Sequence, residues 1–119
     1  MTKYFFDTYA LIALIKNNPD YVKYSDELVT TTHFNLVELY YIILKDFNEE
    51  KALGLYKKFK ECSTDVSDDV IFEAMKLKLK NKSLSYVDCI GYVFAIKNNL
   101  KFLTGDKEFK DMIDVEYVK

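Results

Sequence analysis

Short strand-like segments alternate with longer helical segments along this chain, and the alternation restricts its possible folds more than any other feature. Alternation of this kind predicts an α/β domain with a mostly parallel sheet of about four to five strands and right-handed crossovers. The predicted strands or extended pieces are 3–7, 27–32, 64–68, 101–104 and 115–118. The predicted helices are 8–16, 34–46, 49–62, 68–82 and 85–100.

Polar residues mark the ends of these segments. The Asp7-Thr8 pair falls between the first strand and the first helix, where either residue is a common helix N-cap. Residues 17–20, NNPD, predict a turn and contain the only proline. Asn35 is placed to help start the second helix, and Ser67 or Asp68 to cap the fourth.

The 119 residues predict one compact domain spanning 1–119. Half of them are hydrophobic, which is typical of a globular chain. Cys62 and Cys89 both lie among apolar residues, as reduced core thiols do. No signal-peptide cleavage site is visible, and no apolar run reaches the roughly 18–20 residues of a membrane span. We therefore expect a soluble cytoplasmic protein without a membrane partner.

The formal net charge is −2, and lysine supplies the whole basic side because the chain contains no arginine. This balance argues against a protein that coats nucleic acid, which usually carries a basic surplus. It argues less against a metal-dependent nuclease, where bound cations reverse the charge of an acidic site. The glycines are Gly54, Gly91 and Gly105, so no glycine-rich phosphate loop is present and nucleotide-binding loops are excluded.

Four acidic residues stand out from the rest because each is isolated in, or directly follows, an apolar segment. Asp7 ends the first strand, and Asp106 follows the apolar strand KFLT. Glu38 and Asp88 are the only charges in FNLVELYYIIL and SYVDCIGYVFAI. A buried carboxylate costs several kcal/mol unless it is paired or bound to a metal. Since the carboxyl ends of parallel strands share one edge, Asp7 and Asp106 are expected there together.

Several carboxylates around one point make a site for a hard divalent cation such as Mg²⁺ or Mn²⁺. Such an ion activates water and stabilises charge on a phosphoryl group, which suits phosphodiester hydrolysis. A histidine base is not required, and the only histidine, His33, lies in a predicted turn.

The segments FFDTYALIAL, NLVELYY, SYVDCIGYVFAI and FLTGDKEF resemble, in order and rough spacing, the four acidic motifs of the PIN-domain family. The short stand-alone form is similar to the toxin ribonucleases of VapBC-type toxin–antitoxin pairs. The resemblance implies a three-layer fold, in which a twisted, mostly parallel sheet is flanked by helices. The same resemblance implies a Mg²⁺- or Mn²⁺-dependent endoribonuclease acting on RNA. It also implies a homodimer and a small inhibitory antitoxin.

The resemblance also implies roles for single residues. Asp7, Glu38 and Asp88 would be the main metal ligands, directly or through water, and Asp106 would complete the set. Thr8 and Thr104 match hydroxyl positions that support the acids in the family, and Asn35 lies one helical turn before Glu38. Each of these three also has a structural interpretation: Thr8 and Asn35 as helix caps, and Thr104 as an ordinary strand residue.

One departure concerns substrate binding. Family members often carry arginines near the cleft, but this chain has none. Lysines such as Lys107 or Lys82 would therefore have to contact the substrate phosphate. The missing arginines and the negative charge leave a second hypothesis open, a non-catalytic binding or scaffold module with a structural ion. A receiver or phosphatase-like domain is less consistent with the sequence, because Asp7-Thr8-Tyr9 lacks the second acid that such domains place there.

Overall fold

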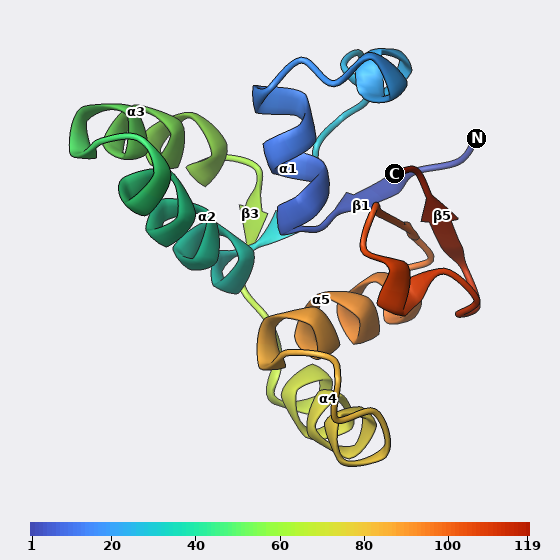
Figure 1. Cartoon of the computed structure of the whole chain (residues 1–119). Coiled ribbons are helices and arrows are strands. Elements are labelled where there is room, and N and C mark those ends of the chain that lie inside the picture. The colour runs from blue at the N-terminus through green and yellow to red at the C-terminus, as the bar shows by residue number, and fades with distance from the viewer.

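The computed structural model describes all residues, 1–119, as five α-helices and five short strands (Figure 1). The strands are β1 (Tyr4–Phe6), β2 (Thr31–Thr32), β3 (Ser63–Thr64), β4 (Lys101–Thr104) and β5 (Val115–Tyr117). The helices are α1 (Thr8–Ile15), α2 (His33–Asp46), α3 (Glu49–Lys60), α4 (Asp68–Lys80) and α5 (Tyr86–Lys97), with 3-10 helices η1 (Pro19–Tyr24) and η2 (Lys107–Phe109).

All paired strands are parallel, as predicted. One sheet has the order β1-β4-β5, and β2 pairs with β3 in a second ladder. The two ladders are joined where the Phe6 amide donates to the Thr30 carbonyl at 2.8 Å and the Thr31 hydroxyl donates to the Phe6 carbonyl at 2.8 Å. Strand β1 therefore lies between β2 and β4. The chain continues to β2 and β3 on one side of β1 and to β4 and β5 on the other, so the strand order reverses at β1.

The predicted strand 27–32 is too long. Only Thr31 and Thr32 form β2, because the partner strand β3 is itself only two residues long and lies at Ser63–Thr64. The predicted extended piece 64–68 overlaps β3 only at Thr64. The β-branched run VTTT favours an extended backbone, but without a longer partner it cannot form a longer ladder.

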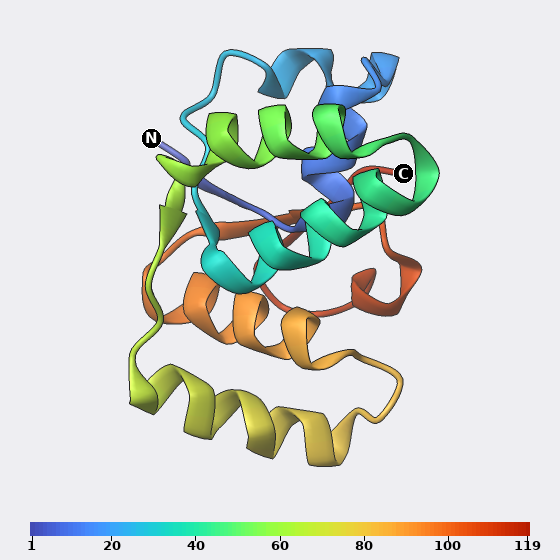
Figure 2. The same cartoon turned by 90° about the vertical axis from the view of Figure 1, so that its left-hand side faces the viewer.

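Helices cover both faces of the sheet, giving three layers (Figures 1 and 2). Successive strand residues point to opposite faces. Phe5 and Phe102 belong to a core cluster shared with α4 and α5, whereas Phe6 and Leu103 belong to a cluster shared with α1, α2 and α3. The apolar runs of β1 and β4 are thus buried on both sides, as expected for parallel strands.

Each helix begins on a side chain that accepts a hydrogen bond from a backbone amide in its first turn. These N-caps are Asp7, Thr32, Asn48, Ser67 and Ser85. The predictions of Asp7 and Ser67 as caps are confirmed. The interpretation of Thr8 and Asn35 as caps is wrong, because Asp7 is the N-cap of α1 and Thr32 is the N-cap of α2. The turn predicted over 17–20 lies earlier in the chain, at Lys16 and Asn17, and η1 begins at Pro19.

Two smaller predictions concern the thiols and the membrane. Cys89 is buried and Cys62 is half-buried, and both are free. No helix of the structure has the length and apolar character needed to cross a bilayer.

Candidate active site

A pocket of about 450 Å³ lies at the carboxyl edge of the sheet, and all four predicted acids line it. Asp7 follows β1, Asp106 follows β4 by one residue, Glu38 comes from α2 and Asp88 from the first turn of α5. Because β1 is the strand at which the order reverses, this is the position where ligands bind in open α/β sheets. The other lining residues are Thr8, Tyr9, Ile12, Ile42 and Ser85.

Asp7 is the most deeply buried of the four acids, with 4% of its surface exposed. One oxygen accepts a hydrogen bond from the Ala10 amide at 2.9 Å, which caps α1. Burial raises the pKa of Asp7 to about 7, and the negative charges of Asp88 and Asp106 add to the rise. The Thr104 hydroxyl and the Ala10 amide act in the opposite direction by stabilising the carboxylate.

Asp88 is held by a reciprocal pair of hydrogen bonds with Ser85. Its carboxylate accepts from the Ser85 amide at 2.9 Å, and its own amide donates to the Ser85 hydroxyl at 3.0 Å. Burial raises the pKa of Asp88, as does the charge of Asp106, whereas Ser85 and the Lys78 ammonium lower it. The serine-x-x-acid spacing of this capping box is visible in the sequence, so Ser85 could have been identified from it.

Glu38 is supported by a chain of buried polar groups. The Thr32 hydroxyl donates to the Asn35 side-chain oxygen at 2.6 Å, and the Asn35 amide group donates to the Thr8 hydroxyl at 3.2 Å. A hydrogen bond from Thr8 stabilises the Glu38 carboxylate, while burial and then Asp88 raise its pKa. Asn35 is only 2% exposed. Asn35 therefore supports the site from beneath the pocket surface, whereas Thr8 lines the pocket.

Asp106 is half-buried and caps the start of η2. Its amide donates to the Thr104 hydroxyl at 3.0 Å, and its carboxylate accepts from the Glu108 amide at 3.0 Å. Thr104 is completely buried; its hydroxyl accepts from the Asp106 amide and also lowers the pKa of Asp7. It is therefore more than a residue with strand propensity, because it joins the ends of β1 and β4 at the pocket.

The donor set fits a hard divalent cation, since every charged group in the pocket is a carboxylate and none has a lysine within 4.0 Å. The structure does not gather the acids on one point, however. No three acidic, histidine or cysteine side chains are close enough together to form a ready-made metal-binding group. The four acids surround a common space, and Asp88 and Asp106 raise the pKa of Asp7 across it.

The basic residues proposed from the sequence lie elsewhere. Neither Lys107 nor Lys82 lines the pocket. Lys78 donates to the Lys82 and Leu84 carbonyls at 2.9 and 2.6 Å and so fixes the loop that leads to Ser85. His33 is exposed at the start of α2, where its ring lies edge-on to that of Tyr56.

A parallel α/β domain with carboxylates at the reversal of strand order defines the class of protein. The sequence model of the PIN domain matches residues 4–114, and the chain belongs to the PIN domain family. No curated protein matches the chain.

Solved structures share the same fold. A chain of a toxin–antitoxin complex from Klebsiella pneumoniae superposes with a TM-score of 0.74 at 19% identity, over 96% of this chain and 96% of that one. VapC20 from Mycobacterium tuberculosis, described as a sarcin–ricin loop cleaving toxin, gives 0.73 at 16% identity, over 95% and 98%. VapBC2 from Rickettsia felis, bound to a promoter DNA fragment, gives 0.73 at 20% identity, over 99% and 100%.

Proposed function

We propose that this chain is a divalent-metal-dependent endoribonuclease that hydrolyses RNA phosphodiester bonds, and that it is the toxin of a toxin–antitoxin pair. One observation carries the proposal: four isolated acids from four separate segments line a single pocket in a chain of the PIN domain family. Structural neighbours with toxin names support it.

The acids in this pocket lower the stability of the folded protein when no ligand is bound. Burial and mutual repulsion raise the pKa values of Asp7, Glu38 and Asp88, and no lysine pairs with any of them. Such an arrangement is typical of a site whose charge is balanced only when a ligand is bound. A divalent cation balances that charge, whereas a purely structural role would be met more favourably by apolar residues.

Asp7, Glu38, Asp88 and Asp106 would hold Mg²⁺ or Mn²⁺, directly or through water. When bound, the ion would activate a water molecule and stabilise the negative charge that develops on the phosphoryl oxygens. The Ser85 amide and the Thr104 hydroxyl hold Asp88 and Asp7 in place, so that little reorganisation is needed on binding.

The test is to incubate the protein with a mixed pool of single-stranded and structured RNA, with Mg²⁺, with Mn²⁺ and with a chelator. We expect cleavage that requires a metal ion and disappears in Asp7→Asn, because asparagine can still cap α1 but cannot balance the charge of a cation. Asp111→Asn is the matched control, since Asp111 is an exposed acid outside the pocket.

Intact cleavage in Asp7→Asn would contradict the proposed site. Absence of cleavage under all conditions, together with a melting temperature that rises on adding Mn²⁺, would instead favour the non-catalytic module with a structural ion. The missing arginines and the net charge of −2 are the observations that favour this second function.

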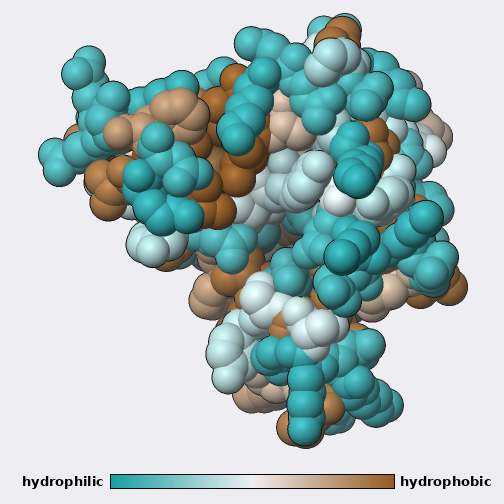
Figure 3. Space-filling view, in the orientation of Figure 1, coloured by the Kyte–Doolittle hydropathy of each residue, from teal (hydrophilic) through white to brown (hydrophobic).

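The proposal includes two protein partners, a second copy of the chain and an inhibitory antitoxin. Helix α2 supports this part, because it exposes an apolar stripe at helical spacing, formed by Phe34, Val37, Tyr41 and Leu44. Figure 3 shows apolar surface gathered over α2 and α3. Apolar patches of this kind commonly mark protein interfaces.

Light scattering on the wild type and Val37→Asp tests the homodimer. Val37 is 53% exposed, so the substitution should leave the fold intact and shift a dimer that uses this stripe to monomer. A wild-type monomer at all concentrations would contradict the homodimer and leave the stripe for a different protein.

A further inference from the structure

A second, smaller pocket of about 200 Å³ adjoins the acidic pocket. Its lining consists of Tyr9, Ile12, Ala13, Lys16 and Asn18. Tyr9 and Ile12 line both pockets, so the two pockets are neighbours along α1. The smaller pocket contains no acid, which gives it a chemistry different from that of its neighbour.

Tyr9 forms a fixed aromatic wall between the two pockets. It packs so closely on Gly105 that a Cβ atom at that position would lie 2.1 Å from the Tyr9 ring. The Tyr21 ring also packs near it, with centroids 6.4 Å apart and the ring planes inclined by 39°. Tyr9 nevertheless keeps 38% of its surface exposed. An aromatic ring that is positioned by packing and still open to solvent is a suitable platform for stacking a base.

Two polar side chains at the end of α1 face the same pocket. Lys16 is exposed and has no carboxylate within 4.0 Å, so its charge is free to contact a phosphate. The Asn18 side-chain oxygen accepts from the Asp20 amide at 2.9 Å, which leaves the side-chain nitrogen without a protein acceptor. Asn17, with a φ of 57°, makes the turn that carries Asn18 back toward the helix, where its amide donates to the Ala13 carbonyl at 3.0 Å.

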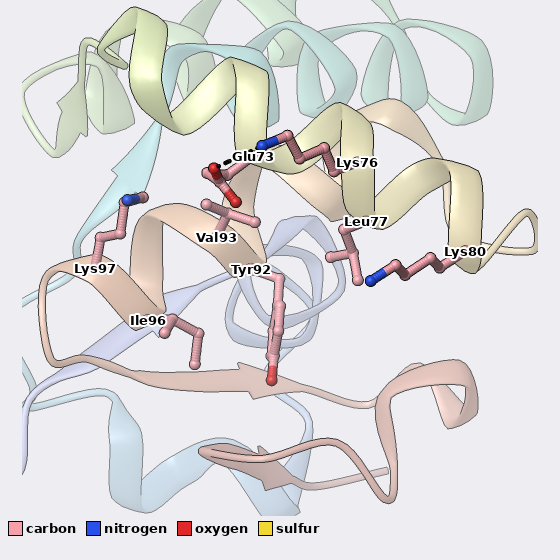
Figure 4. Close-up of a pocket in the computed structure, with 8 residues that line it drawn as sticks. All are labelled: Glu73, Lys76, Leu77, Lys80, Tyr92, Val93, Ile96 and Lys97. Atoms are coloured by element: carbon pink, nitrogen blue, oxygen red, sulfur yellow. Dashed lines mark hydrogen bonds and ion pairs between the residues drawn. The ribbon is translucent and has the colours of Figure 1, made fainter.

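The other large hollow has a different character. It lies between α4 and α5, measures about 410 Å³, and has an apolar floor with lysines on its rim (Figure 4). Lys76 is already paired with Glu73 at 3.4 Å. This hollow shares no lining residue with the acidic pocket, so nothing links it to the reaction there.

We propose that the pocket formed by Tyr9, Ile12, Ala13, Lys16 and Asn18 binds one unpaired nucleotide of the RNA substrate, next to the bond that is cut. Its base stacks on Tyr9 and its phosphate contacts Lys16, while the Asn18 amide nitrogen donates to an acceptor on the base edge. A paired base is already stacked in its helix and cannot enter, so the substrate is single-stranded at this point. The inference rests on the ribonuclease proposed above and adds a nucleotide-binding subsite to it.

The experiment measures binding separately from cleavage. Fluorescence anisotropy with a labelled, unstructured 12-nucleotide RNA pool, in chelator, gives a Kd for the wild type, Tyr9→Ala, Tyr9→Phe and Lys16→Gln. We expect Tyr9→Ala to raise the Kd about 5- to 100-fold, the range for loss of one stacked base, and Tyr9→Phe to stay within about twofold. Lys16→Gln should lower the slope of log K against log salt by about 0.7, as for one phosphate contact on a single strand.

Matched controls come from exposed residues outside the pocket. Phe72→Ala removes an aromatic ring that is 62% exposed on α4 and does not belong to the apolar stripe of α2. Lys97→Gln removes an exposed lysine at the end of α5. Phe72→Ala and Lys97→Gln should leave the Kd within about twofold, and a blunt RNA duplex should bind all variants equally. Melting temperatures establish that Tyr9→Ala is folded.

Unchanged binding by folded Tyr9→Ala, or an equal loss in Tyr9→Phe, would overturn the inference. If Asp7→Asn abolishes cleavage while Tyr9→Ala binds and cleaves normally, the inference fails and the ribonuclease stands. If the wild type binds no RNA and cleaves none, both fail together.

Discussion

The acidic pocket and the hollow between α4 and α5 are similar in size, about 450 and 410 Å³, but they differ in how they hold charge. In the hollow the lysine tips lie in solvent, and one of them is paired with Glu73. In the pocket Asp7 is buried, Glu38 and Asp88 are half-buried, and no lysine lies within 4.0 Å of their carboxylates. Only Asp88 has a more distant cation, Lys78, that lowers its pKa.

The hollow is therefore an ordinary surface feature, whereas the acidic pocket needs a ligand to balance its charge. Exposed lysines cost the fold little and improve solubility, so the hollow has a sufficient explanation without function. Buried acids that repel one another lower stability, so folding alone gives no reason for them. The predictions below test this distinction.

The largest effect is expected on catalysis. Asp88→Asn should lower the rate of metal-dependent RNA cleavage by about 100-fold or more, since even residues that only support metal ligands account for about 10- to 100-fold. Asparagine can still accept from the Ser85 amide, so the helix start is preserved. Lys80→Gln in the hollow should change the rate by less than about twofold. Equal losses in the two variants, measured as single-turnover rates, would remove the distinction.

The second prediction concerns stability and pH. The pKa of Asp7 is about 7 in the folded protein and 3.8 as the reference value, so folding favours its protonated form. Without metal, this contribution to stability is present below about pH 4 and is lost as the pH rises through about 7. Asp7→Asn should therefore stabilise the metal-free protein by about 2 kcal/mol at pH 8, or roughly 8 °C in melting temperature, and by less at pH 5.

The same variant gives the opposite result with metal. Mn²⁺ should raise the melting temperature of the wild type at pH 8 and have little effect on Asp7→Asn, because the cation binds the folded state through this carboxylate. Thermal denaturation in chelator and in Mn²⁺ measures both effects. A wild type that is more stable than the variant in chelator at pH 8 would show that Asp7 is a structural residue.

The sequence predicted the acids better than it predicted their surroundings. Asp7, Glu38, Asp88 and Asp106 could be found because a lone charge in an apolar segment is unusual wherever the segment folds. The alternation of segments likewise predicted a mostly parallel sheet. The length of β2 could not be predicted from the threonine-rich run, because a ladder also depends on the partner strand, and β3 has only two residues.

Tyr9 and Asn35 show why the rest was harder to predict. Tyr9 lines the site because its ring packs on Gly105, which is distant in sequence but adjacent at the carboxyl edge of the sheet. Asn35 looked like a cap, yet it connects Thr32 on β2 to Thr8 on α1. Contacts of this kind are set by how strands align, which local composition does not reveal.

The third prediction tests the Asn35 contact. Asn35→Ala removes the acceptor of the Thr32 hydroxyl and the donor to Thr8, both buried, and should destabilise the protein by about 1–2 kcal/mol. Asn81→Ala is the control, since the Asn81 side chain makes only an exposed 3.4 Å bond to Leu77 and its loss should cost less than about 0.5 kcal/mol. Urea denaturation measures both, and equal costs would show that the buried chain contributes no more than a surface bond.

The smallest expected effect is the change in stability when either of two helical glycines, Gly54 or Gly91, is replaced by alanine. Gly54 in α3 has no atom within 4 Å of where a Cβ would lie, so Gly54→Ala should stabilise the protein by about 0.5–1 kcal/mol through helix propensity alone. A Cβ on Gly91 in α5 would lie 3.0 Å from the Phe5 ring, which is completely buried and stacked on Phe102. Gly91→Ala should therefore gain no stability, and by moving α5 away from β1 it should displace Asp88 and slow cleavage. A stabilised, fully active Gly91→Ala would mean that the close approach of α5 to β1 is not needed to place the acids.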